Sequence, residues 1–355
     1  MTEAIENTNT GSTGGLGFAY RSYERAYLNY PGVVHDAGVI TRLGRIGRQI
    51  VDRGRRGVTR AVVRAVVPER VLGDVLENPE TAGLVEGAVP TAFVSQTNGT
   101  SSEPLWMILA AINHRDRTPL YPVPEMIGQV DEGKRIPMQP EQRIAQLRHE
   151  GYRFIDTIPP ERIDEMQELW GDSFEWQRVG IAELSASLSA AHSLQPRGRG
   201  VWFSGIVEPG TNRLAAVATA ERLDIPLHDG QTLPIVESTE WRRSDRVRRH
   251  GLAAAAVVHL NAQVLEDLSG CSPKIIAETN FRTRADRVGF AAGMDVPLRQ
   301  FRGRFLPQML IQNVRVGDGF ESDRKRDFTL MHISDESVQT LFSPASRHAV
   351  LKGGI

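Results

Sequence analysis

The sequence has almost no cysteine and no long apolar run. Cys271 is the only cysteine in 355 residues, which excludes an intramolecular disulfide and a cysteine-based zinc cluster and is typical of a reducing cytoplasm. No stretch approaches the roughly 18–20 apolar residues that a membrane span needs. The opening MTEAIENTNTGSTGG has no basic segment and no apolar core, so no signal peptide is expected. These absences predict a cytoplasmic protein without a membrane span.

Excess charge is also missing. The formal net charge is −1, so no global field points to a nucleic acid or a membrane surface. With 40% hydrophobic and 24% charged residues, the composition is that of an ordinary globular protein. His35 and His114 stand alone, without metal-ligand spacing, so no metal is expected. The length is comfortable for two domains.

The most informative stretch spans residues 233–294. LPIVESTEW and PKIIAETN are short apolar runs, and the Ala/Val/Leu-rich LAAAAVVHLNAQVLEDL lies between them after the arginine-rich RRSDRVRRHG. FRTRADRVGFAAGM follows the second run. Short apolar runs suit buried strands, and the longer Ala-rich stretch suits a helix. The pattern predicts strand, basic loop, helix, strand and helix.

The basic loop at 248–253 has the features of an anion site. Successive backbone N–H groups at the start of a helix lack intrahelical partners, and the helix dipole adds positive charge there. The small residues Gly251 and Ala253 would let a phosphate approach the backbone. The candidate anion-binding residues are Arg246, Arg248, Arg249, His250, Gly251, Leu252 and Ala253. The alternative is a helix start whose arginines are simply solvated.

The stretch resembles the GNAT superfamily of N-acetyltransferases. Arg248, Gly251 and Ala253 occupy the defining positions of its Arg/Gln-x-x-Gly-x-Gly/Ala pyrophosphate loop. AETN at 277–280 and GFAAGM at 289–294 resemble the elements that follow this loop in the family. The resemblance covers residues 152–334, about half of the chain. No family is recognised for residues 1–139.

The resemblance implies a mixed, mostly antiparallel sheet flanked by helices. The first strand is expected at 151–158, two helices at 159–174 and 179–192, a hairpin at 200–207 and 214–222, and two closing strands after Met294. A short helix is expected at 140–148. The predicted organisation is a disordered N-terminus at 1–17, a helix-rich domain at 18–140, the GNAT-like domain at 141–335 and a loosely held tail at 336–355.

The resemblance further implies acetyl-CoA as co-substrate and a small-molecule or peptide amine as acceptor, without a metal. The pantetheine arm is expected along the strand before the loop, at Ser238, Thr239 and Trp241, and at Asn280. An ordinary helix N-cap is the alternative role for Asn280. Trp170, Phe174 and Trp176 are the candidates for contacts with the acceptor, and core packing is their alternative.

A base must remove a proton from the amine. Glu237 is the first candidate, followed by Glu240 and Glu278; surface or salt-bridged glutamates are the alternative. Residues three apart on a strand face opposite sides, so at most one of Glu237 and Glu240 points to the acceptor. The family often has a tyrosine acid on its last helix, and residues 281–290 contain none. A non-catalytic CoA-binding or assembly module therefore stays open as a second hypothesis.

In the N-terminal half, spacing predicts helices. The aromatic residues of 18–30 recur every three or four positions, residues 39–71 form a basic amphipathic pattern, and Ser101 or Ser102 precedes an expected helix. The arginines at 42–70 raise a third hypothesis, a transferase acting on an RNA-linked or carrier-linked substrate. A homo-oligomer is also compatible with the sequence.

Overall fold

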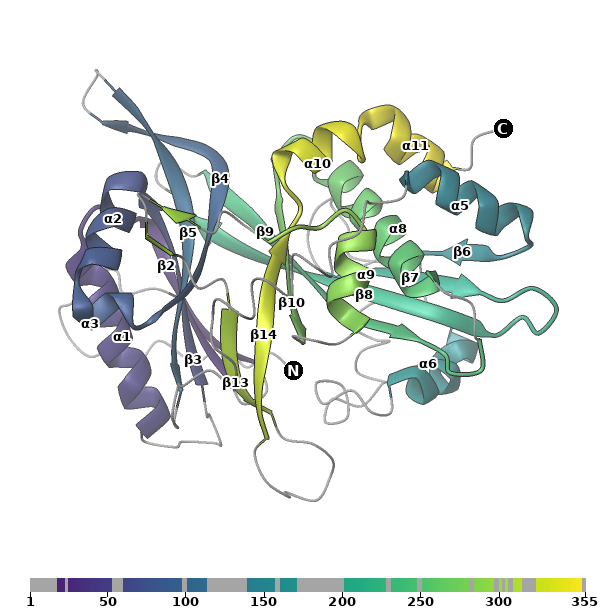
Figure 1. Ribbon diagram of the computed structural model, residues 1–355, viewed down its shortest axis with the longest axis horizontal. Coiled ribbons are helices and arrows are strands. Elements are labelled where there is room, and N and C mark those ends of the chain that lie inside the picture. Colours follow the sequence, from purple (N-terminus) through teal and green to yellow (C-terminus); the bar gives the residue numbers. More distant parts are fainter. Residues whose placement is uncertain are drawn as a thin grey trace.

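The computed structural model describes residues 18–22, 25–52, 60–97, 101–113, 139–156, 160–170, 201–227, 231–247, 251–280, 284–296, 300–301, 304–305, 309–314 and 324–352. They form two adjacent sheets, each carrying helices on the face turned away from the other sheet (Figure 1). The architecture is mixed α/β, with mostly antiparallel sheets flanked by helices. The fold class expected from the sequence is confirmed.

The N-terminal sheet has five strands in the order β1-β2-β3-β5-β4. Its strands are β1 (Phe18–Ser22), β2 (Arg25–Val33), β3 (Arg60–Pro68), β4 (Val85–Thr97) and β5 (Ser101–Asn113). Three helices cover its outer face: α1 (Ala37–Asp52), α2 (Glu69–Glu77) and α3 (Pro79–Ala82). In β3, Ala61, Val63 and Val67 pack toward these helices, whereas Val66 packs on the C-terminal sheet.

The helix-rich interpretation of this half was wrong over its described residues. Residues 18–22 and 25–33 are strands, and so is the segment after Ser101. Within the arginine-rich stretch, residues 37–52 are the expected helix, but 60–68 form the central strand β3. RAVVRAVVP is buried on both faces, so its valines carry no alternation that distinguishes strand from helix.

The C-terminal sheet has seven strands in the order β13-β14-β10-β9-β8-β7-β6. The strands are β6 (Arg153–Ile155), β7 (Val201–Val207), β8 (Leu214–Pro226), β9 (Thr232–Arg243), β10 (Lys274–Asn280), β13 (Met309–Val314) and β14 (Arg324–His332). Neighbouring strands are antiparallel except β9 and β10, which are parallel. The strands expected at 151–158, 200–207, 214–222, 233–241 and after Met294 are confirmed. A separate two-stranded ribbon joins β11 (Gln300–Phe301) to β12 (Arg304–Phe305).

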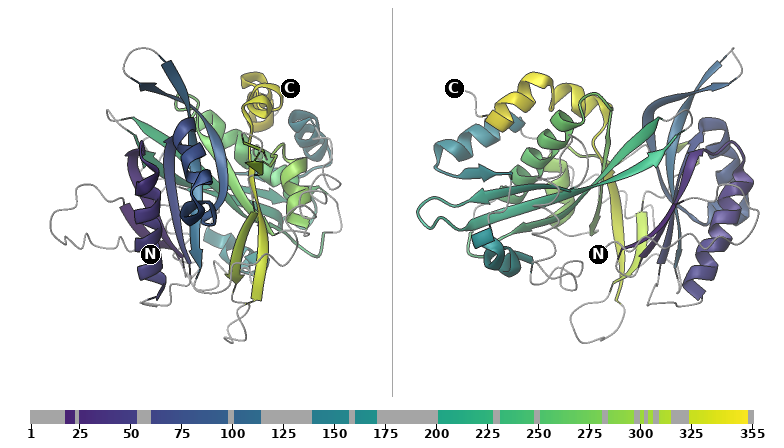
Figure 2. Two further views of the ribbon diagram at one scale, coloured as in Figure 1. Left: turned by 60° about the vertical axis from the view of Figure 1, so that its left-hand side comes forward. Right: turned by 180° about the vertical axis from the view of Figure 1, so that it is seen from behind.

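Helix α8 (Leu252–Asp267) packs on one face of this sheet, and α5 (Pro140–His149) and α11 (Pro344–Lys352) cover it (Figures 1 and 2). Helices α9 (Arg284–Ala291) and α10 (Asp335–Thr340) complete the layer. The tail is not loosely held, because Phe342 and Val350 are fully buried in the α8 core. Among the described residues, no helix is both long and apolar enough to cross a membrane.

The opposite face of the C-terminal sheet has two covers. The short η2 (Pro160–Arg162) and α6 (Ile163–Trp170) pack on β7 and β8 through Met166, Phe203 and Val217. The N-terminal sheet packs on the far ends of β8, β9, β10 and β14. Its contribution to that shared core includes Val66, Met107 and Leu109, which meet Ile225, Leu233, Ile235, Ile276 and Leu330.

Candidate functional site

Strands β9 and β10 are paired over a short length and then separate. The pairs are Lys274 with Ile235, Ile275 with Val236 and Ile276 with Glu237. Beyond Glu237, β9 continues to Arg243 and β10 to Asn280 with no further pair between them in these described segments. Among the described residues, β9 therefore has no strand partner on its β10 side beyond Glu237.

A β-bulge lies in the same part of β9. Val217 of β8 is opposite Arg242 and Thr219 is opposite Thr239, so two residues, Glu240 and Trp241, face the single Ala218. The bulge shifts the alternation of side chains. Accordingly Trp241 lies on the same face as Ser238, and its indole Nε1 donates to Ser238 Oγ at 2.9 Å. The sequence analysis predicted that the side chains of Glu237 and Glu240 point to opposite faces of the strand. That prediction assumed regular alternation, which the bulge interrupts after Thr239.

Gly251 opens helix α8 in a left-handed conformation. Its φ is +88°, it is exposed, and its carbonyl accepts the first helical hydrogen bond from Ala255 at 2.9 Å. The side chain of Leu252 is fully buried, so only its backbone is available at the helix start, and Ala253 is half-buried. Amides in a first helical turn have no intrahelical acceptor. The expected strand-to-helix junction is present, and Arg248, Arg249 and His250 lie outside the described residues.

Arg143 of α5 lies beside this junction, and the sequence interpretation missed it. A Cβ on Gly251 would be 2.8 Å from Arg143 Nη2. The guanidinium also donates to Gln146 Oε1 at 3.1 Å. Residues 143 and 251 are brought together only by the packing of α5 on α8, so no local sequence signal reports the contact.

Two predicted cofactor contacts have other partners. Arg246, in the turn after β9, is exposed and lies 3.7 Å from Glu168 of α6, and its amide donates to Ser244 Oγ at 3.3 Å. Ser238 is buried and accepts from Trp241. Trp241 is half-buried and borders α9, where a Cβ on Gly289 would be 3.5 Å from its ring. Trp241 thus packs between β9 and α9, against the α8 core.

Glu237, the first candidate base, is bonded to the N-terminal sheet. Arg64 Nη2 of β3 donates to Glu237 Oε2 at 3.0 Å, and the two side chains are 0% and 16% exposed. Glu221 of β8 is directly opposite Glu237. The Glu221 side chain is exposed at the surface, but most of its surroundings are protein rather than water. This desolvation raises the pKa of Glu221, the charge of Glu237 raises it further, and the charge of Arg64 lowers it. Neither Arg64 nor Glu221 was among the predicted site residues.

The other predicted residues are placed only by their backbones. Thr239 is opposite Thr219, Glu240 lies in the bulge, and Glu278 and Asn280 are opposite Leu330 and Phe328 of β14; these side chains lie outside the described residues. Asn280 is the last residue of β10, and residues 281–283, which precede α9 (Arg284–Ala291), lie outside the described part of the chain.

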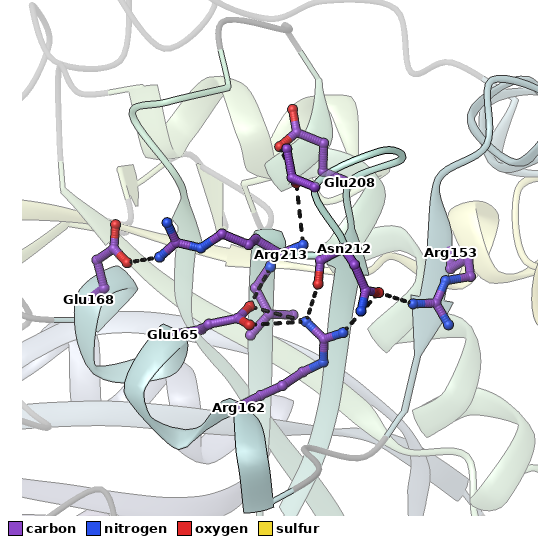
Figure 3. A network of polar contacts seen from close by, with 9 residues as sticks. Arg153, Arg162, Glu165, Glu168, Glu208, Asn212 and Arg213 are labelled. Atoms are coloured by element: carbon purple, nitrogen blue, oxygen red, sulfur yellow. Dashed lines mark hydrogen bonds and ion pairs between the residues drawn. The ribbon is translucent and has the colours of Figure 1, made fainter.

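Trp170 is the last residue of α6, with its side chain outside the description, and Phe174 and Trp176 lie outside it altogether. Helix α6 itself is fixed to the β7–β8 hairpin (Figure 3). Arg162 Nη1 donates to Glu165 Oε2 at 3.1 Å and to the Asn212 carbonyl at 2.8 Å, while Glu165 Oε2 accepts from the Leu214 amide at 2.6 Å. Arg213 bonds to Glu168 in the same network. Helix α6 therefore lies against β8 and β9.

The described residues contain no group of three or more His, Cys, Asp or Glu side chains arranged to hold a metal ion. Comparison with protein families finds no matching family model, and no curated protein matches the sequence.

Several solved structures resemble about half of the chain in part. Arabidopsis thaliana NAA60 in complex with acetyl-CoA is 14% identical over 51% of this chain and 97% of that chain, with a TM-score of 0.36. A GNAT-family acetyltransferase from Streptococcus pneumoniae is 11% identical over 51% and 98%, with a TM-score of 0.36. A probable N-acyltransferase from Enterococcus faecalis V583 is 14% identical over 41% of this chain, which spans only 32% of that protein, with a TM-score of 0.29. Likenesses of this size establish no activity or substrate for this chain.

Proposed function

We propose that this protein is an acyl-CoA-dependent N-acyltransferase that transfers an acetyl group from CoA to an amine. The observation that carries the proposal is the separation of β9 from β10 after Glu237, next to a helix that opens at an exposed left-handed glycine. An open strand edge suits an extended amide-containing arm, and a helix N-terminus suits its phosphates. Both features occur within one strand–loop–helix unit.

The residues present fit a CoA molecule. The diphosphate would be held by the backbone amides at Gly251, Leu252 and Ala253 and by Arg143, with Arg246, Arg248, Arg249 and His250 as further candidates. A side chain at 251 would displace the Arg143 guanidinium, so the glycine lets this guanidinium lie against the helix start. The arm would run along Ser238, Thr239 and Trp241 toward Asn280.

Acetyl-CoA supplies an activated thioester, and this chain's residues position the amine against it. Backbone N–H groups on the open edge of β9 polarise the thioester carbonyl. The amine nitrogen forms the C–N bond as the C–S bond breaks. A carboxylate takes the amine proton; Glu237, Glu240 and Glu278 are the candidates named from sequence. Trp170, Phe174 and Trp176 are proposed to contact the acceptor, a small molecule or a peptide.

Calorimetric titration with acetyl-CoA tests the proposal. Wild-type protein should bind one equivalent, and Arg143→Ala should weaken binding about 10- to 150-fold, because a charge-assisted hydrogen bond contributes roughly 1.5–3 kcal/mol. Arg48→Ala, a change at an exposed arginine of α1, is the matched control and should leave the affinity unchanged. No heat of binding at near-millimolar acetyl-CoA would reject the proposal.

Release of free thiol then separates catalysis from binding. A protein that binds acetyl-CoA but releases no thiol with any amine is the non-catalytic module of the second hypothesis. Turnover with an RNA-linked amine, and with no other amine, would favour the third hypothesis, a transferase that acts on an RNA-linked or carrier-linked substrate.

A further inference from the structure

A polar strip crosses the face of the C-terminal sheet between its two covers. The α6 cluster ends at Val217, and the core shared with the N-terminal sheet begins at Ile225 and Ile235. Between them lie Glu221 and Glu237. Directly opposite residues of antiparallel strands point to the same face, with Cβ atoms about 5 Å apart. The two carboxylates therefore lie side by side on this face of the sheet.

Arg64 makes the two carboxylates unequal. Its guanidinium is fully buried and bonded to Glu237 Oε2, which holds Glu237 in one place as an ion. Glu221 reaches solvent instead. One guanidinium and two ionised carboxylates carry a net charge of −1, which complements a single ammonium group.

The pair is also close to the open end of the sheet. Glu237 belongs to the last β9–β10 pair before the strands separate. Glu221 and Glu237 therefore lie next to the point where β9 and β10 separate, on the face that the N-terminal sheet partly covers.

We propose that Glu221 and Glu237, with Arg64 from the N-terminal sheet, bind the acceptor as a cationic amine and that Glu221 takes up its proton. This inference rests on the proposed function and names its substrate class, an aliphatic amine that is protonated near neutral pH. The ammonium passes one N–H proton to the Glu221 carboxylate and becomes the neutral nucleophile. After C–N bond formation, a second amine proton leaves with the departing thiolate as free thiol, and Glu221 returns its proton to solvent.

The electrostatics suit this role. A base works best when its pKa lies near the operating pH, and burial together with the Glu237 charge raises the pKa of Glu221. Arg64, on β3, and Glu237, on β9, are the described charged groups that face it. Glu237 contacts the bound ammonium and raises the pKa of Glu221 but takes up no proton, whereas Arg64 acts through Glu237 and is a positioning residue.

The experiment measures thiol release from acetyl-CoA by the full chain with aliphatic primary amines from ethylamine to spermidine, as a function of pH. Glu221→Gln should lower kcat/KM about 100-fold or more and abolish the acidic limb of the pH profile. Glu237→Gln should move that limb to lower pH, because it removes the charge that raises the Glu221 pKa. Glu336→Gln, at an exposed residue of α10, should behave as wild type.

Carbon-13 NMR titration of the side-chain carboxyls, assigned by the signal lost in Glu221→Gln, needs no acceptor. A Glu221 midpoint at or below the ordinary glutamate value overturns the inference. So does wild-type protein that binds acetyl-CoA but turns over none of the amines, or an unchanged profile in Glu221→Gln. Absence of acetyl-CoA binding is a different result and rejects the proposed function itself.

Discussion

Two strand–helix–strand units of the molecule, β2–α1–β3 and β9–α8–β10, connect parallel strands in the same way but differ in pairing. Strands β2 and β3 pair from Arg25 with Arg60 up to Val33 with Val66, along nearly their whole length. Strands β9 and β10 pair over three residues and then separate. Among the described residues, the first unit is paired at both ends of its strands, with an irregularity between Asn29 and Val33, whereas the second is paired at one end only.

The N-termini of α1 and α8 also differ in whether a side chain of the protein accepts a hydrogen bond from a helix amide. Asp36, before α1, accepts the Gly38 amide on its Oδ1 at 2.9 Å, so a carboxylate of the chain itself occupies the anion position. Helix α8 opens with Gly251, which has no side chain to accept its amides. Under the proposed function, the ligand binds where the strand pairing ends early and the helix start has no capping side chain.

Gly251→Asp should give the largest effect, because it gives α8 the carboxylate that α1 has. The new side chain would collide with Arg143, adopt an unfavourable φ and repel a phosphate. We expect acetyl-CoA affinity, measured by calorimetry, to fall at least about 100-fold, since two charge-assisted hydrogen bonds at roughly 1.5 kcal/mol each are lost.

Gly210→Asp is the matched control. Gly210 also has a positive φ, +80°, but nothing lies within 4 Å of a Cβ there. This variant should lose some stability and keep its affinity for acetyl-CoA. The converse change, Asp36→Gly, should create no binding at α1, because β2 and β3 remain paired. Equal losses of affinity in the Gly251 and Gly210 variants would contradict the assignment.

Arg64→Met should give the next largest effect, on stability. It removes the buried partner of Glu237 and leaves a carboxylate between the two sheets without its ion pair. Breaking a buried pair by removing one partner costs about 3 kcal/mol or more, measurable by urea unfolding. The exposed pair Arg45–Glu80, at 72% and 67% exposure, is the comparison, and Arg45→Met should cost roughly 0.5 kcal/mol or less. Similar costs for the two variants would show that Arg64 does not join the sheets.

The sequence was informative where a segment's own pattern decides its structure. The runs at 233–241 and 274–280, the Ala-rich α8 and the β7–β8 hairpin have lengths and turn residues typical of one element each, and all formed as predicted. In contrast, RAVVRAVVP has no polar face, because the N-terminal sheet is covered on both sides. Without that alternation, nothing in the sequence indicated that β3 is a strand, and the N-terminal sheet was not predicted.

Site residues that depend on contacts between distant segments were beyond the sequence. Arg143 reaches Gly251 only through helix packing, and Arg64 reaches Glu237 only because two sheets meet. Arg64 looked like one of many surface arginines, although it is fully buried. Glu221 lay in a predicted strand, and only the register with β9 placed it opposite Glu237.

The smallest expected effect is a loss of stability at acidic pH. It should arise from a residue of α8 rather than of α1. Helix α8 is buried beneath α5 and α11 and contains His259, which is 4% exposed; α1 is covered on one face only and has no histidine. Burial, reinforced by the Arg148 charge, lowers the pKa of His259 from 6.5 to about 3. Its Nδ1 lies 2.9 Å from the Gln263 amide, a donor that suits the neutral ring.

Because the folded pKa lies below the unfolded value, the unfolded chain takes up the proton first as pH falls. The contribution of His259 to the free energy of unfolding is therefore fully present above about pH 6.5 and is lost as the pH falls below that value. Between pH 7 and pH 5.5 we expect His259 to reduce the free energy of unfolding by about 1 kcal/mol. Burial lowers the pKa of His332 to about 4, so it adds a similar loss. Urea unfolding at the two pH values should show a smaller decrease for His259→Asn than for wild type. The exposed His149→Asn should keep the wild-type decrease, and an equal decrease in all three proteins would mean that α8 does not set the acid sensitivity.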